Sequence, residues 1–127
     1  MDVYKTHGAF SWSELTTTDP AAAAAFYGGL FGWSVKEMGA ELGGYRVVSV
    51  GDQGVAGIMG MSPGAPPMPP HWGCYVTVTD VDAALVKCVE LGGKTLVPAM
   101  DVPTVGRMAV IQDPQGATLS LMQYAGS

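Results

Sequence analysis

The chain has 127 residues and a formal net charge of −5, from six basic and eleven acidic residues. This length fits one domain, and the acidic balance excludes the basic surface that nucleic acids and anionic membranes select. No apolar run reaches the roughly 18 residues of a membrane span, and the first residues lack the layout of a signal peptide. The two cysteines make no disulfide framework. We therefore expect a cytoplasmic domain that binds neither nucleic acid nor membrane.

The two halves of the chain resemble each other at a spacing of 61 to 62 residues. Asp19 and Asp80 are 61 residues apart, and Gly44 and Gly106 are 62 apart. Further matches occur in the same order over about sixty residues. Because order is kept over the whole stretch, we interpret the halves as diverged copies of one unit.

Each copy predicts the same succession of elements. Apolar and β-branched stretches predict first strands over 10–16 and 73–78. Asp19 and Asp80 follow these strands and have the side chain of an N-cap, so helices are predicted directly after them. The predicted helices cover 20–30 and 81–91, and the later strands cover 33–38, 44–50, 54–60, 94–98, 106–112 and 116–123. The prediction is an α+β fold of two tandem βαβββ modules.

The first module covers about 7–60, the second about 72–124, and the stretch 61–71 between them is rich in proline. We interpret 1–127 as a single domain made of these two modules. The connecting stretch has two interpretations. It is either a stiff connector, or a loop that closes over a pocket with Met61 and Met68 as apolar contacts.

This pattern resembles the vicinal oxygen chelate superfamily, which contains glyoxalase I, bleomycin-resistance proteins and extradiol dioxygenases. The resemblance rests on the doubled βαβββ unit, the Asp-capped helix with its Phe26-Tyr27 pair, and the segment from Pro98 to Gly116 with its closing DPxG turn. It covers about residues 7–124 and is strongest to small actinobacterial glyoxalase-like proteins. It implies a cupped mixed sheet around a cavity and a homodimer.

In metal-dependent members of that superfamily, each module supplies two metal ligands, usually His, Gln or Glu. The resemblance places these positions at Trp12, Ile58, Gly73 and Ser120. Trp, Ile and Gly have no side-chain group for a hard divalent ion, and a lone Ser is a poor ligand. We therefore expect no metal and no other cofactor.

Glu14 is the candidate catalytic residue. It shares a strand face with Trp12, and Tyr75 is its equivalent in the second module. Desolvation on an inward face would raise the pKa of its carboxyl and suit a general base. Three roles stay open for Glu14: a hydrogen bond to Tyr75 or the backbone, contact with a ligand, or catalysis.

Other polar and aromatic positions have two interpretations each. Trp12 either stacks on a flat ligand or fills the volume of the lost metal site. Arg107 either binds an anion or pairs with Asp101 or Asp113. His71 is a surface residue or a ligand contact. The candidate ligand-binding residues are Trp12, Glu14, Tyr45, His71, Tyr75, Arg107 and Ser120.

Two functions follow from this reading. The first is a metal-independent protein, like the bleomycin-resistance proteins, that binds a small and partly aromatic molecule in an apolar cavity. The second is a metal-free lyase or isomerase in which Glu14 abstracts a proton.

Overall fold

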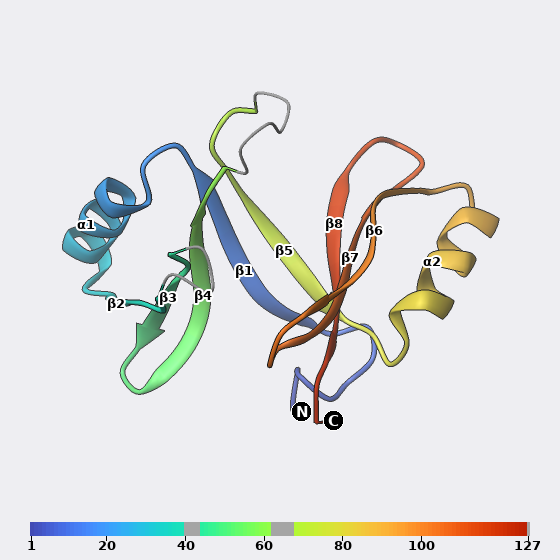
Figure 1. Ribbon diagram of the computed structural model, residues 1–127, viewed down its shortest axis with the longest axis horizontal. Helices are drawn as coiled ribbons and strands as arrows, with labels where there is room; N and C mark the ends of the chain where they lie inside the picture. The colour runs from blue at the N-terminus through green and yellow to red at the C-terminus, as the bar shows by residue number, and fades with distance from the viewer. Residues whose placement is uncertain (40–43, 62–67, 127) are drawn as a thin grey trace. The chain divides into compact units, whose positions relative to one another are not determined.

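A computed structural model of the chain describes residues 1–39, 44–61 and 68–126 (Figure 1). Over these ranges it contains two helices and eight strands. The elements are β1 (Phe10–Thr17), α1 (Pro20–Phe31), β2 (Ser34–Glu37), β3 (Arg46–Val50), β4 (Gln53–Gly60), β5 (His71–Thr77), α2 (Val81–Glu90), β6 (Lys94–Val102), β7 (Gly106–Gln112) and β8 (Thr118–Tyr124). The predicted α+β fold, with the order βαβββ repeated once, is confirmed.

The ends of some strands differ from the prediction. Strand β5 begins at His71, inside the stretch predicted as a connector. Strand β6 continues past Pro98 to Val102, because it is the last strand of its sheet and its register with β7 shifts between Val97 and Met100. An edge strand tolerates proline in this way, since one side needs no backbone donors. The segment 62–67 lies outside the described residues, so the proposed closing loop stays a prediction.

The chain divides into two compact units. The first unit is Trp12–Gly73, and the second combines Met1–Ser11 with Cys74–Ser127. In the first unit the strands lie in the order β2-β3-β4-β1, with β1 parallel to β4. In the second unit the order is β5-β8-β7-β6, with β5 parallel to β8. The remaining described pairs, β2 with β3, β3 with β4, β6 with β7 and β7 with β8, are antiparallel.

Parallel first and last strands place a helix on one face of each unit, because the chain must cross over between them. The face of the first unit under α1 carries its buried core, which consists of Leu15, Val48, Ala56 and Ile58. Ala23, Ala24 and Tyr27 pack against this core from α1. In the second unit α2 packs on the corresponding core of Val78, Val81, Ala109 and Leu121. Each helix thus buries one face of its strands and leaves the other face for a site.

Both helices begin at the predicted caps. A side-chain oxygen of Asp19 accepts a hydrogen bond from the backbone N–H of Ala22 at 3.0 Å. Asp80 caps α2 in the same way, through Ala83 at 3.1 Å. Helix α1 ends at Gly32, whose φ of 74° is the left-handed conformation that glycine adopts without strain. Among the described residues, no helix has the length and apolar character needed to cross a membrane.

The first residues of the chain belong to the second unit. Gly8 donates to the carbonyl of Thr77, and the Thr77 N–H donates to the carbonyl of Ala9, both at 2.8 Å. The hydroxyls of Ser11 and Tyr124 are hydrogen-bonded at 2.7 Å. The backbone contacts of Gly8 and Ala9 extend the strand pairing of the second unit by residues that precede β1, and Ser11 adds a side-chain contact from β1 itself.

Candidate functional site

Three of the candidate residues form a hydrogen-bonded chain in the first unit. The indole N–H of Trp12 donates to the hydroxyl of Tyr45 at 2.9 Å. That hydroxyl donates in turn to Oε2 of Glu14 at 2.8 Å. Trp12 and Glu14 are two residues apart on β1, so they lie on the same face of the strand. The Tyr45 hydroxyl therefore orients the carboxylate and fixes the indole ring at once.

Two glycines of β4 make room for this arrangement. Gly57 is the partner of Glu14 in the parallel register of β1 and β4. A Cβ atom at Gly57 would overlap the hydroxyl of Tyr45. At Gly54, a Cβ would lie 3.3 Å from Cγ1 of Val47, a tight contact, and at an ordinary contact distance of 3.8 Å from the ring of Trp12. Gly57 was the sequence feature that could have indicated the pairing of Tyr45 with Glu14, because a glycine inside a strand often marks the close approach of another group.

This face is the one that α1 leaves uncovered. Leu15 alternates with Trp12 and Glu14 along β1, and it lies in the core under the helix. Ile58 alternates with Gly57 along β4 and is fully buried in the same core. The position that the resemblance assigned to a metal ligand at Ile58 therefore points into the core, and Gly57 is its neighbour on the open face.

The donor set does not fit a divalent metal ion. Trp12 has no lone pair on its indole nitrogen to give, and its N–H is already donated to Tyr45. Ile58 is apolar and buried. Among the described residues, no group of three or more His, Cys, Asp or Glu side chains is placed to hold a metal.

Tyr75 and Ser120 lie together in the second unit. They are partners in the parallel register of β5 and β8, so their side chains share a face. Tyr75 is buried, with 7% of its surface exposed. Glu14 belongs to the first unit and Tyr75 to the second, so the predicted contact between them stays a prediction.

Both histidines bind backbone groups. Nδ1 of His71 lies 2.9 Å from the carbonyl oxygen of Pro69, and since a carbonyl only accepts, this nitrogen carries the proton. Nδ1 of His7 accepts from the N–H of Thr79 at 3.1 Å, which puts its proton on Nε2. His71 is an exposed residue of β5. These contacts match the surface interpretation of His71 more closely than the ligand interpretation.

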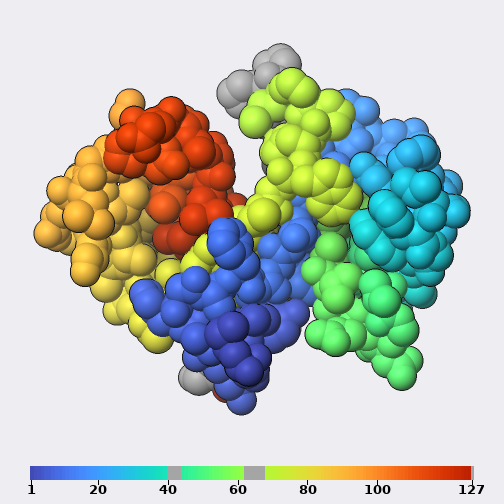
Figure 2. Space-filling model, turned by 180° about the vertical axis from the view of Figure 1, so that it is seen from behind, coloured from blue at the N-terminus to red at the C-terminus, as the bar shows by residue number. Residues whose placement is uncertain are grey.

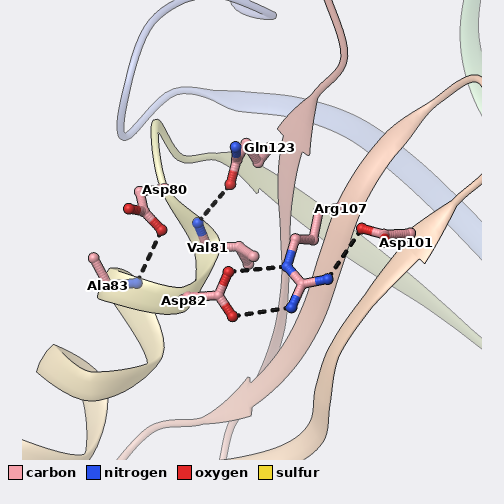
Figure 3. Close-up of polar contacts among 7 residues, drawn as sticks. All are labelled: Asp80, Val81, Asp82, Ala83, Asp101, Arg107 and Gln123. Carbon is pink, nitrogen blue, oxygen red and sulfur yellow. Dashed lines mark hydrogen bonds and ion pairs between the residues drawn. The ribbon is translucent and has the colours of Figure 1, made fainter.

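Arg107 pairs with two carboxylates of the second unit (Figure 3). Its guanidinium binds Asp82 through two hydrogen bonds of 2.9 and 3.1 Å, and it binds Asp101 at 3.0 Å. The ion pair with Asp101 was one of the predicted alternatives, whereas Asp82 was missed. The hydrogen bonds that Arg107 donates to these carboxylates raise the pKa of Arg107, and the one to Asp82 lowers the pKa of Asp82. An anion at Arg107 would have to displace one of these partners.

The same corner fixes the start of α2 on the sheet (Figure 3). The side-chain oxygen of Gln123, on β8, accepts from the backbone N–H of Val81 at 2.9 Å. The side chain of Asp80 accepts a hydrogen bond from the N–H of Ala83, and Arg107, which lies on β7, forms an ion pair with Asp82. Arg107 therefore helps to attach α2 to the strands of its unit, which is a structural role.

An open groove of about 430 Å³ lies in the second unit, along α2 and the turn before β8. Its walls are mostly apolar and include Cys88, Leu91 and Pro114. None of the seven candidate ligand-binding residues lines it. The groove therefore adds nothing to the site on β1.

The profile of one protein family matches residues 9–121, which is most of the chain. The chain belongs to the Glyoxalase/Bleomycin resistance protein/Dioxygenase superfamily. The resemblance inferred from the doubled βαβββ unit is confirmed. Within this superfamily the chain departs from the metal-binding pattern at Trp12, Ile58 and Gly73, as described above.

Two relatives within the superfamily are informative. CFP32 of Mycobacterium tuberculosis, whose name assigns it provisionally to the glyoxylases, is 44% identical over 119 residues, which cover 91% of this chain and 46% of CFP32. The anthracycline biosynthesis protein DnrV of Streptomyces peucetius is 36% identical over 129 residues, which cover 90% of this chain and 46% of DnrV. The chain thus spans about half the length of these relatives.

Solved structures of the superfamily share the fold. Methylmalonyl-CoA epimerase from Mycobacterium tuberculosis superposes with a TM-score of 0.66 at 17% identity, over 95% of this chain and 91% of the epimerase. An extradiol ring-cleaving dioxygenase from B. fuscum gives 0.64 at 19% identity, over 91% of this chain and 32% of the dioxygenase. At these identities the likeness concerns architecture alone.

We expect Gly57→Ala to destabilise the protein by about 1–3 kcal/mol, the usual cost of leaving polar groups without their hydrogen bonds. The added Cβ would force the Tyr45 hydroxyl away from Trp12 and Glu14. Urea unfolding measures the effect. The control is Gly73→Ala, where a Cβ meets nothing within 4 Å. Equal unfolding free energies for Gly57→Ala and the wild type would show that the Tyr45 contacts are unimportant.

A second prediction concerns pH. Since the pKa of Asp82 is lowered in the folded protein, its contribution to stability is fully present above the pKa of the unfolded chain, near 3.8. That contribution is lost as the pH falls through the lower, folded value. We expect Arg107→Gln to return the Asp82 pKa towards 3.8, which carboxyl carbon-13 NMR measures. An unchanged Asp82 titration would mean that the ion pair does not form in solution.

Proposed function

We propose that the protein binds a small, partly aromatic organic molecule on the open face of the first unit, without a metal ion. The observation that carries this proposal is the chain of hydrogen bonds from Trp12 through Tyr45 to Glu14. These residues combine a flat apolar ring with a hydroxyl and a carboxylate, which is the usual composition of a small-molecule site. Trp12 stands at one of the four positions that the resemblance assigns to metal ligands.

The physical basis of binding would be stacking and a few directed polar contacts. The indole of Trp12 is held in place by Tyr45, so little rotational freedom is lost when a flat ligand stacks on it. Oriented polar groups at its edge would select the ligand. A relative, DnrV, is named for anthracycline biosynthesis, and the superfamily is named in part for bleomycin resistance. Both names support a flat or partly aromatic ligand for this chain.

The alternative is a metal-free lyase or isomerase. It is favoured by the hydrogen bond from Tyr45, which aims the half-buried carboxylate of Glu14 along the open face. In such an enzyme Glu14 would take a proton from a carbon next to a carbonyl group, and the same carboxyl would return it. The Tyr45 hydroxyl would hold the carboxylate in place during the transfer.

We expect the purified protein to contain less than about one-tenth of an equivalent of zinc, nickel, iron or manganese. The reason is the donor set, because a structural or catalytic metal needs three or four ligating side chains. Plasma emission spectroscopy measures the content, and EDTA should leave the melting temperature unchanged. Stoichiometric metal that survives dialysis would contradict this part of the proposal.

Ligand binding can be tested by calorimetric titration with a commercial anthracycline and, separately, with bleomycin. We expect a Kd of about micromolar size for one of them, and a loss of about tenfold or more in Trp12→Ala. Trp72→Ala is the matched control, since it removes an exposed tryptophan outside the site. Failure of both compounds to bind at millimolar concentration would overturn the proposal.

The ligand recovered from the same titrations separates the two functions. An unchanged ligand supports a binding protein, with Glu14→Gln reducing affinity only. A chemically altered ligand supports the enzyme, provided that Glu14→Gln abolishes the change while the variant still binds. Alteration that persists in Glu14→Gln would remove Glu14 from the reaction.

A further inference from the structure

The groove along α2 is a feature of the second unit that the proposed function does not use. Its volume of about 430 Å³ lies within the usual size range of small-molecule sites. All the residues that line it belong to the second unit. Figure 2 shows α2 (yellow to orange) at the surface of this unit, beside the turn before β8 (red-orange). A site in this groove would be separate from the one proposed on β1.

Comparison of the two helices shows where the space in the groove comes from. Cys88 lines the groove, and its equivalent at the 61-residue spacing is Tyr27. In the first unit Tyr27 packs against the buried core, with its ring 5.6 Å from that of Trp33. The equivalent of Trp33 in the second unit is Lys94. The second unit therefore carries neither ring at these positions, and space remains beside the small thiol of Cys88.

The walls of the groove are aliphatic. Ala83, Cys88 and Leu91 line it from α2, and Ile111 and Leu121 line it from the strands. No Phe, Tyr or Trp ring is among the described residues that line it. A flat ligand would therefore gain no ring stacking here, whereas an alkyl chain gains from burial against these walls. The lining follows α2 from its first turn to its end, and a helix of ten residues is about 15 Å long, so the shape suits an extended chain.

The two acidic residues of the groove already have hydrogen-bond partners. Asp80 accepts from the N–H of Ala83 at 3.1 Å, as the cap of α2. Oδ1 of Asp113 accepts from the N–H groups of Gln115 and Ala117, both at 2.9 Å. Backbone donors thus stabilise the charge of each carboxylate. These two carboxylates serve the start of a helix and a turn.

The two basic residues of the groove still have donors to offer. Among the described residues, the ammonium group of Lys87 has no ion pair and no hydrogen bond. Nδ1 of His7 accepts from the N–H of Thr79, so Nε2 carries the proton. This second N–H also has no acceptor within the described part of the chain. Donors of this kind favour an acceptor with negative charge.

We propose that the groove binds a small aliphatic carboxylate, with the alkyl chain along α2 and the carboxylate on the ammonium group of Lys87. The chain would cover Leu91, which is 71% exposed. The N–H of His7 is a second donor at the groove. A singly charged head group suits a groove that also holds Asp80 and Asp113, since a phosphate with nearly two negative charges would be repelled by both.

The thiol of Cys88 is a natural probe of the groove. In Cys74→Ser it is the one thiol left in the chain, because the sequence has two cysteines. Octanoate should slow the alkylation of Cys88 by iodoacetamide in a saturable way, with half-maximal protection at about millimolar concentration. Octanoate should also bind about twofold or more tightly per added methylene group than hexanoate, because each methylene adds buried apolar surface. Calorimetric titration of the unmodified protein should give the same order of affinities.

The head group is tested with octanol and octylammonium, which carry the same alkyl chain. Octanoate should bind about threefold to fivefold more tightly than octanol, the usual effect of an exposed ion pair, and octylammonium should bind most weakly. Lys87→Gln should remove the advantage of octanoate and leave the affinity for octanol unchanged. Lys36→Gln is the matched control, since it removes the same charge from β2 of the first unit, and it should keep the advantage.

A variant that fills the groove tests the position of the alkyl chain. Ala83→Leu adds an aliphatic side chain to the wall and keeps a residue that favours helix, so it should weaken octanoate binding about tenfold while circular dichroism stays unchanged. Saturable binding of none of the three compounds would overturn the proposal. So would tighter binding of octylammonium than of octanoate, or octanoate binding that is unchanged in both Ala83→Leu and Lys87→Gln. None of these outcomes depends on the ligand proposed for Trp12 and Glu14.

Discussion

Parallel pairing of the first and last strand is the constraint on which each unit of this protein depends. A parallel pair cannot be closed by a tight turn, so the chain crosses over as a helix and covers one face of its strands. The alternate residues of β1 then have separate tasks. Leu15 enters the core beneath α1, while Trp12 and Glu14 lie on the open face. Neighbouring residues of a single strand thus divide between the buried core and the proposed site.

The polar contacts on the open face of the first unit centre on one hydroxyl group, that of Tyr45. Tyr45 both accepts from Trp12 and donates to Glu14, so its position depends on both partners, and Gly57 supplies the space for it. A carboxylate held by a phenol has a fixed direction, which serves either recognition or proton transfer.

The fold could be predicted from the sequence because each pattern that marks a helix or a strand occurs twice, once in each half. Asp19 and Asp80 marked both helix starts, and the repeated spacing fixed the order of the strands. The hydrogen bond from Tyr45 to Glu14 did not follow from it, because pseudo-symmetry related Glu14 to Tyr75 alone, whereas the register of β3 and β4 brings Tyr45 over Gly57. That register contains a shift between Val48 and Ser49 which hydrophobic periodicity does not record.

Side-chain contacts between elements that are distant in the sequence were also not fully predicted. Arg107 was expected to pair with Asp101 or Asp113, but Asp82 also reaches it from α2. The oxygen of Asp113 instead accepts from the N–H groups of Gln115 and Ala117 within its own turn. Short polar side chains in turns often bind such local N–H donors, so Asp113 is engaged in its own turn and Arg107 pairs with Asp82 of α2 instead.

The two helix starts illustrate how duplicated halves come to differ. Pro20 and Val81 hold the equivalent first position of α1 and α2, but proline has no backbone N–H. Val81 has one, and Gln123 accepts its hydrogen bond. The residue that corresponds to Gln123 in the first half, at the 62-residue spacing, is the apolar Met61. Each helix start thus leaves no backbone N–H without an acceptor at its first position. The first half has neither donor nor acceptor, in Pro20 and Met61, and the second half has both, in Val81 and Gln123. Exchanging a single member between the halves would leave either a backbone donor without its acceptor or a side-chain acceptor without its donor.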